Sequence, residues 1–197
     1  SGGTMGAGYS DWCVYSQALV GVTGESDAFL YLNSTAAKSN SSSVFGSAPS
    51  STVFNIGNNQ LINNTGSDFV AYCFADTDGK VKTGSYPGNG SADGPYVELG
   101  FKPAWLMIKR TDSANDWLIV DTARDPYNPA YRDLYPNENV AEYSGASRPY
   151  DLLSSGFKLR DTVGRANASG GTYIYIAFAE NFTEGGYKPT TKFNTIT

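Results

Sequence analysis

Short apolar runs, separated by residues that favour turns, recur along the chain. The clearest are residues 69–76 and 173–180, in which alternate side chains lie on opposite faces and both faces are apolar. A strand of this kind is typical of the middle of a sheet that is covered on both sides. Residues 104–108, Ala-Trp-Leu-Met-Ile, predict another buried strand. The pattern therefore predicts an all-β chain.

The chain contains two copies of one β-rich unit. Five blocks correspond in the same order at a spacing of about 104 residues: 11–15 with 116–120, 30–33 with 134–137, 52–56 with 155–159, 64–66 with 168–170, and 69–76 with 173–180. Each copy reads as strand, long loop, strand, turn, strand. We divide the chain into a first copy at 1–78, a second copy at 79–182 and a C-terminal tail at 183–197.

The second copy has an upstream portion that the first copy lacks. This portion begins at Gly84 and includes the strand at 104–108, whereas only a short, glycine-rich stretch precedes Trp12 in the first copy. We therefore predict two tandem β-sandwich domains that meet near residues 77–95, the first of them without its N-terminal strands. The expected core residues are Trp12, Phe54, Phe69 and Phe74 in the first domain and Trp117, Phe157, Tyr173 and Phe178 in the second.

The C-terminal tail contains a candidate for the lost strand. Its Gly186-Tyr187-Lys188-Pro189 is similar to Gly100-Phe101-Lys102-Pro103, which leads into the strand at 104–108. The residues that follow alternate with a period of two, which suits the addition of a strand to a sheet. We predict that the tail completes the first domain of a neighbouring subunit through Tyr187, Pro189, Phe193 and Ile196. Insertion within one chain, a frayed terminus and a strand from another protein are the alternatives.

Composition agrees with a β-rich chain and excludes two kinds of partner. Aromatic residues make up 14% of the chain and charged residues only 17%, which favours strands over charged surface helices. The net charge is −5, and the 14 lysines and arginines form no basic cluster, so we expect no nucleic acid partner. No apolar run approaches the length that spans a bilayer, so we expect no membrane partner.

The absence of histidine limits the chemistry that the chain can perform. It removes the commonest general base, the usual zinc ligand and every imidazole-based triad. We interpret Cys13 and Cys73 as two buried thiols, with a disulfide as the alternative. We read residues 76–79 as a turn rather than a calcium loop, because the glutamate that such a loop needs is missing. We expect no cofactor, no transition metal and no enzymatic activity.

The loop at residues 125–150, where the two copies diverge, is the predicted contact surface. It contains tyrosine, arginine and asparagine, which are enriched where proteins dock or sugars stack. The candidate contact residues are Tyr127, Asn128, Tyr131 and Arg132. The acidic residues around it could in principle form a glycosidase pair, but the interleaved arginines favour a solvated loop with ion pairs; these acids are Asp121, Asp125, Asp133, Glu138 and Glu142.

At residues 100–110, 116–117, 151–160 and 167–180, the chain resembles a repeated domain of bacteriophage virion proteins, chiefly of tail fibres and related appendages. The likeness covers residues 84–182 closely and residues 11–76 more loosely. It implies a concanavalin-like, jelly-roll β-sandwich, a location in the virion or outside the cell, and a role in virion structure or host attachment. It supplies no catalytic residues.

Two functions follow from these observations. The first is a structural subunit of a phage virion appendage or extracellular filament, which forms a homo-oligomer or filament through β contacts between subunits. The alternative is a lectin-like, carbohydrate-binding host-adhesion module of a tail fibre, with a cell-surface glycan as its partner. A glycan-degrading enzyme is a third and weaker hypothesis. Size in solution separates the first two, because a filament subunit associates with itself.

Overall fold

The computed structural model describes residues 11–23 and 26–180, and this part of the chain is mostly β. It contains ten strands and two short helices, which confirms the all-β prediction. The first part contains β1 Cys13–Val14, α1 Gln17–Thr23, β2 Ala28–Tyr31, β3 Ser39–Asn40 and α2 Gln60–Asn63. The second contains β4 Val81–Pro87, β5 Tyr96–Glu98, β6 Pro103–Arg110, β7 Trp117–Asp121, β8 Tyr150–Leu153, β9 Gly156–Leu159 and β10 Thr172–Ala179.

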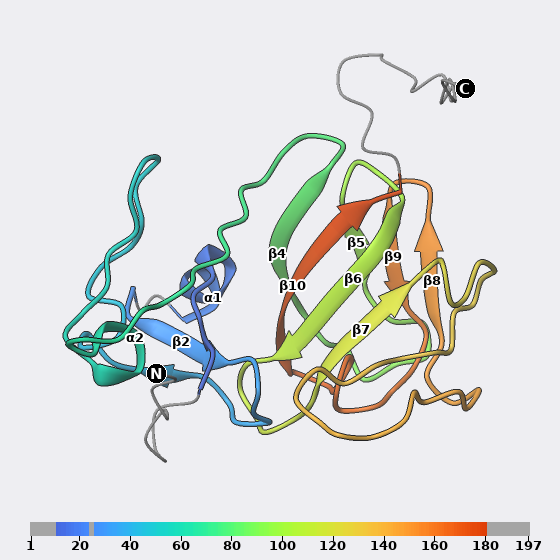
Figure 1. Cartoon of the computed structure of the whole chain (residues 1–197). Helices are drawn as coiled ribbons and strands as arrows, with labels where there is room; N and C mark the ends of the chain where they lie inside the picture. Colours follow the sequence, from blue (N-terminus) through green and yellow to red (C-terminus); the bar gives the residue numbers. More distant parts are fainter. Residues whose placement is uncertain (1–10, 24–25, 181–197) are drawn as a thin grey trace, which may run out of the picture.

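The seven strands from β4 to β10 form two facing sheets (Figure 1). One sheet has the order β4-β10-β6-β7, the other has the order β5-β9-β8, and all their pairings are antiparallel. Strand β10 is held on both sides, by β4 and by β6. The prediction that residues 173–180 form a central strand is therefore confirmed, apart from Glu180, which follows the strand.

The main core lies between the two facing sheets and is rich in aromatic rings. Tyr86 stacks on Tyr173 with 5.0 Å between ring centroids and meets Phe157 edge-on at 5.9 Å. The predicted core positions Phe157 and Tyr173 are buried. The prediction for Phe178 was wrong, because the alternation of β10 that turns Tyr173 inward turns Phe178 outward, where it is only half-buried.

The first part of the chain packs on the outer face of the four-stranded sheet. Leu19 of α1 and Leu30 of β2 form a second apolar cluster with Ile174 and Trp117. The Trp117 indole Nε1 also donates a hydrogen bond of 2.9 Å to the backbone carbonyl of Tyr31. Trp117 is thus buried as predicted, but between the two parts of the chain rather than between the two sheets.

One local motif recurs with the same hydrogen bonds in both copies. The Trp12 amide donates to Asn33 Oδ1 at 3.0 Å, and Asn33 Nδ2 donates to Asp11 Oδ1 at 3.0 Å. The second copy repeats both bonds, from the Trp117 amide to Asn137 Oδ1 at 2.8 Å and from Asn137 Nδ2 to Asp116 Oδ1 at 3.1 Å. In each copy, the asparagine side chain therefore holds a later segment of the chain against the Asp-Trp pair at the start of a strand.

The rest of the first copy does not form the strands that its sequence predicts. Residues 52–56 and 69–75 adopt no regular secondary structure. The four predicted core residues Trp12, Phe54, Phe69 and Phe74 are 49% to 59% exposed, so that prediction was wrong. The physical reason is that β4, β5 and β6 close the second copy, and the described part of the first copy has no strand equivalent to them.

Candidate functional site

The predicted contact loop presents fewer free side chains than its composition indicates. Tyr127 is 83% exposed and extends into solvent. Asn128 instead holds the loop to β8, because its Nδ2 donates to the Leu152 carbonyl at 3.0 Å and its Oδ1 accepts from the Leu152 amide at 2.8 Å. Of these two predicted contact residues, only Tyr127 is thus free to meet a partner.

Tyr131 and Arg132 are fixed by an acidic side chain of the same loop. The backbone amides of both residues donate to Asp125 Oδ2, at 2.6 and 2.7 Å. The Arg132 guanidinium lies 3.6 Å from Asp125 and 3.9 Å from Glu142. The predicted ion pairs of this loop are therefore confirmed, and they leave Arg132 partly neutralised by its own neighbours.

A buried polar cluster lies beneath the loop, and sequence reasoning missed it. Asp133 was expected in a solvated loop but is fully buried, with Arg148 Nη1 3.5 Å from its Oδ2. Among the described residues, no hydrogen-bond partner is found for three buried atoms: Asp133 Oδ1, the Tyr150 hydroxyl and Asp161 Oδ2. Burial raises the pKa of the Asp161 carboxyl to about 6 and also raises the pKa of Asp133, against the effect of Arg148. These groups have no open access, so we assign them no ligand.

Exposed apolar side chains follow one another along residues 69–75, called the open segment below. Phe69, Val70, Tyr72 and Phe74 are all more than half exposed. Within the described part of the chain, its backbone makes a single hydrogen bond, in which the Ala75 carbonyl accepts from the Thr77 hydroxyl at 3.3 Å. Apart from that carbonyl, the N–H and C=O groups of these seven residues have no partner among the described residues, and they lie beside apolar side chains.

Aromatic contacts hold the open segment against the rest of the protein at two points. The Phe74 ring meets Phe178 of β10 edge-on at 5.5 Å, and Tyr72 stacks on Trp12 at 6.3 Å. A cleft of about 480 Å³ lies between the segment, α1 and the edge strand β4. The open segment is thus anchored by its side chains, while its backbone stays free.

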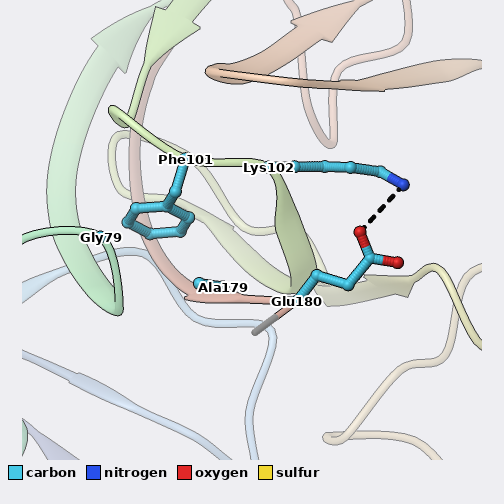
Figure 2. A pocket seen from close by; sticks show the side chains of 5 residues that line it. All are labelled: Gly79, Phe101, Lys102, Ala179 and Glu180. Atoms are coloured by element: carbon cyan, nitrogen blue, oxygen red, sulfur yellow. Dashed lines mark ion pairs between the residues drawn. The ribbon is translucent and has the colours of Figure 1, made fainter. Parts of the chain in front are cut away.

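The end of β10 shows how the second copy arranges the same region. Figure 2 shows Phe101 and Lys102, which lead into β6, beside Ala179 and Glu180 at the end of β10. The ammonium of Lys102 lies 3.1 Å from Glu180 Oε2, and the Glu180 amide donates to the Lys102 carbonyl at 3.2 Å. An ion pair therefore marks the place where β6 begins to pair with β10.

Both cysteines are free thiols, but they differ in exposure. Cys13 is half-buried, and burial, with a smaller effect of Asp11, raises the pKa of its thiol to about 11. Cys73 lies in the open segment and is exposed. The prediction of a buried thiol was therefore wrong for Cys73, for the same reason that its strand neighbours are uncovered.

This difference predicts selective labelling. In dilute protein near pH 7.5, a maleimide should modify Cys73 first, because the raised pKa of Cys13 lowers its thiolate fraction by about a hundredfold. Peptide mass spectrometry after short labelling times measures the ratio. Equal labelling of both thiols would contradict the placement of Cys73 on the surface.

Comparison with known proteins places this architecture in a family. Residues 5–182 match DUF7483, a domain of unknown function, and the match spans both copies. The chain belongs to the DUF7483 family. The DUF7483 match ends close to where β10 ends, so it leaves out the whole tail at 183–197. Comparison with curated proteins and with solved structures found no match.

The remaining sequence predictions concern the tail and bound groups. Tyr187, Pro189, Phe193 and Ile196 lie outside the described residues, and the tail hypothesis stays a prediction. In the described ranges, no three histidine, cysteine or acidic side chains are grouped so that they could hold a metal ion. No described helix has the length and apolar character needed to cross a membrane.

Proposed function

We propose that this chain is a structural subunit of a virion appendage or extracellular filament, and that it assembles through β contacts between subunits. The open segment is the observation that carries the proposal, because it combines exposed apolar side chains with an unpaired backbone. The resemblance of residues 100–110 and 167–180 to a domain of phage tail fibres supports the placement in a virion.

An exposed strand edge is a feature that folded proteins rarely leave unprotected. Unpaired edges invite other chains to pair, and most proteins protect them with charges, prolines or short strands. Between Asp68 and Asp76 the open segment has no charge and no proline. Its counterpart β10 is covered by strands on both sides. We infer that a strand of another chain pairs with residues 69–75, as neighbouring strands pair with β10.

The proposal also accounts for the tandem arrangement expected from the sequence. With a partner strand along residues 69–75, the first copy would gain the kind of neighbour that β6 provides for β10. Its exposed rings, such as Phe69 and Phe54, would then have a layer to pack against. The first copy would become a second jelly-roll-like sandwich only on assembly.

Glycan binding is the alternative, and Tyr127 is the observation that favours it. An exposed aromatic ring provides a stacking face for a sugar. Sugar recognition also needs polar groups around such a ring, and here Asn128 bonds to Leu152 while Arg132 lies beside Asp125 and Glu142. The loop therefore offers little for a glycan beyond one exposed ring. Glycan binding by the loop has weaker support than self-association through the open segment.

A charge placed on the open segment tests the proposal. Tyr72 is 71% exposed, so Tyr72→Lys should leave the fold intact. It should abolish association, because a lysine in an edge strand opposes β pairing. Analytical ultracentrifugation over a range of concentrations measures the effect, with the wild type associating and the variant remaining a monomer of 21.1 kDa.

Tyr127→Lys is the matched control, since it places the same charge on another exposed tyrosine. It should associate as the wild type does. A wild-type chain that stays monomeric at all concentrations, or a Tyr72→Lys variant that associates normally, would overturn the proposal. Loss of association only in Tyr127→Lys would move the interface to the loop.

A further inference from the structure

We propose that the strand covering the open segment is formed by residues 186–196 of a second copy of this chain. This inference rests on the proposed function and names its partner. Residues 186–196 lie outside the described part of the chain, and we infer their pairing from their sequence and from the pairing between β6 and β10.

The internal repeat gives the register. In the second copy, β10 pairs with β6 so that Ala177 lies opposite Leu106 and Ala179 opposite Pro103. The open segment corresponds to β10, and Gly186-Tyr187-Lys188-Pro189 corresponds to the Gly100-Phe101-Lys102-Pro103 lead-in of β6. Transferring the pairing places Pro189 opposite Ala75, Lys192 opposite Cys73 and Phe193 opposite Tyr72. The new strand is antiparallel to the open segment.

Charge complementarity supports this register. In the second copy, the Lys102–Glu180 ion pair marks the start of the β6–β10 pairing (Figure 2). The same positions are Lys188 in the tail and Asp76 at the end of the open segment. Asp76 Oδ2 already lies 3.2 Å from the ammonium of Lys82. Lys188 would therefore share this carboxylate with Lys82.

The same criterion opposes direct pairing of two open segments. Antiparallel self-pairing centred on Tyr72 would place Asp68 opposite Asp76 at both ends of the ladder. Like charges directly opposite each other destabilise a strand pair. Tail pairing places a lysine near Asp76 instead, so we choose the tail as the occupant.

Supply by a second copy also determines the form of the assembly. The open segment accepts a strand, and a different part of the chain donates it, so the contact is head-to-tail. Head-to-tail contacts form rings when the rotation closes and open filaments when it does not.

Donation of the tail within one chain is the competing arrangement. The Ala75 end of the open segment precedes the turn at 77–80, and the Lys80 backbone carbonyl accepts a hydrogen bond of 2.8 Å from the Ala179 amide near the end of β10. Donation within one chain is thus within reach, and the experiment must separate the two.

Disulfide trapping uses the native Cys73 as a reporter. With Cys13 replaced by serine, Lys192→Cys should place a second thiol opposite Cys73, at a separation that a disulfide can bridge. Mild oxidation and a non-reducing gel should then show a ladder of bands larger than one chain. Thr191→Cys is the register control, because its side chain lies on the other face of the donated strand and should lose the cross-link.

Each outcome has a defined meaning. A ladder in Lys192→Cys, lost in Thr191→Cys and after deletion of residues 183–197, supports the proposal. A disulfide confined to single chains overturns donation by a second copy and also the proposed route of assembly. Absence of the Lys192→Cys cross-link in a protein that still associates, with Ala71→Cys cross-linking instead, overturns the tail but keeps the proposed function. Absence of both cross-links and of association overturns both.

Discussion

Replacing Trp117 with alanine is expected to lower the free energy of unfolding by about 3–5 kcal/mol. The indole is buried between the outer face of the four-stranded sheet and the first part of the chain, where it contacts Leu30 and Ile174. Its removal leaves a cavity there and takes away the donor that satisfies the Tyr31 carbonyl. Urea denaturation followed by circular dichroism measures the loss.

Trp12 is a matched control for this substitution. It occupies the same place in the repeated motif and forms the same backbone bond to an asparagine, but its side chain is 49% exposed. Trp12→Ala should therefore cost about 1 kcal/mol or less, since it leaves little cavity. Equal costs for the two variants would contradict a shared core between the two parts of the chain.

The sequence predicted those elements whose neighbours are encoded in the same chain. Residues 173–179 read as a central strand and are one, because β4 and β6 supply both of their partners. Residues 69–75 carry the same alternation and form no strand, since the described part of the chain supplies neither neighbour. The period-two alternation shows that a segment is suited to form a strand. Forming the strand also requires a hydrogen-bonding partner for its backbone.

The candidate site was predicted unevenly for a related reason. Residue type identified Tyr127 as exposed but misplaced Asn128, whose bonds to Leu152 depend on β8 lying beside the loop. Asp133 appeared among arginines in a hydrophilic stretch, and only the fold shows that it lies in the interior. Composition describes a loop on average, and long-range packing decides which of its side chains turn inward.

The buried polar cluster predicts a stability that depends on pH. Asp161 is 5% exposed, and within the described ranges only one of its two carboxylate oxygens accepts a hydrogen bond, from the Val163 amide at 3.2 Å. Burial raises the pKa of this carboxyl to about 6 in the folded state, above the ordinary value of 3.8 expected when unfolded. Between these values the folded protein binds more protons than the unfolded chain, so stability falls as pH rises.

Asp161→Asn should remove this pH dependence. The amide carries no charge at any pH and keeps an oxygen for the Val163 bond, so the variant should exceed the wild type at pH 7 by up to about 3 kcal/mol. The difference should shrink as the pH falls towards 3.8 and become small well below it, where the wild-type carboxyl is protonated in both states.

Asp112→Asn is the opposite control. Hydrogen bonds from Arg110 lower the pKa of Asp112 to about 2, against the effect of burial, so loss of this carboxylate should destabilise the protein at pH 7. Urea midpoints at pH 4, 5, 6 and 7 compare the three proteins. Parallel curves for wild type and Asp161→Asn over this range would show that the Asp161 carboxyl ionises at its ordinary pKa and contributes nothing to the pH dependence of stability.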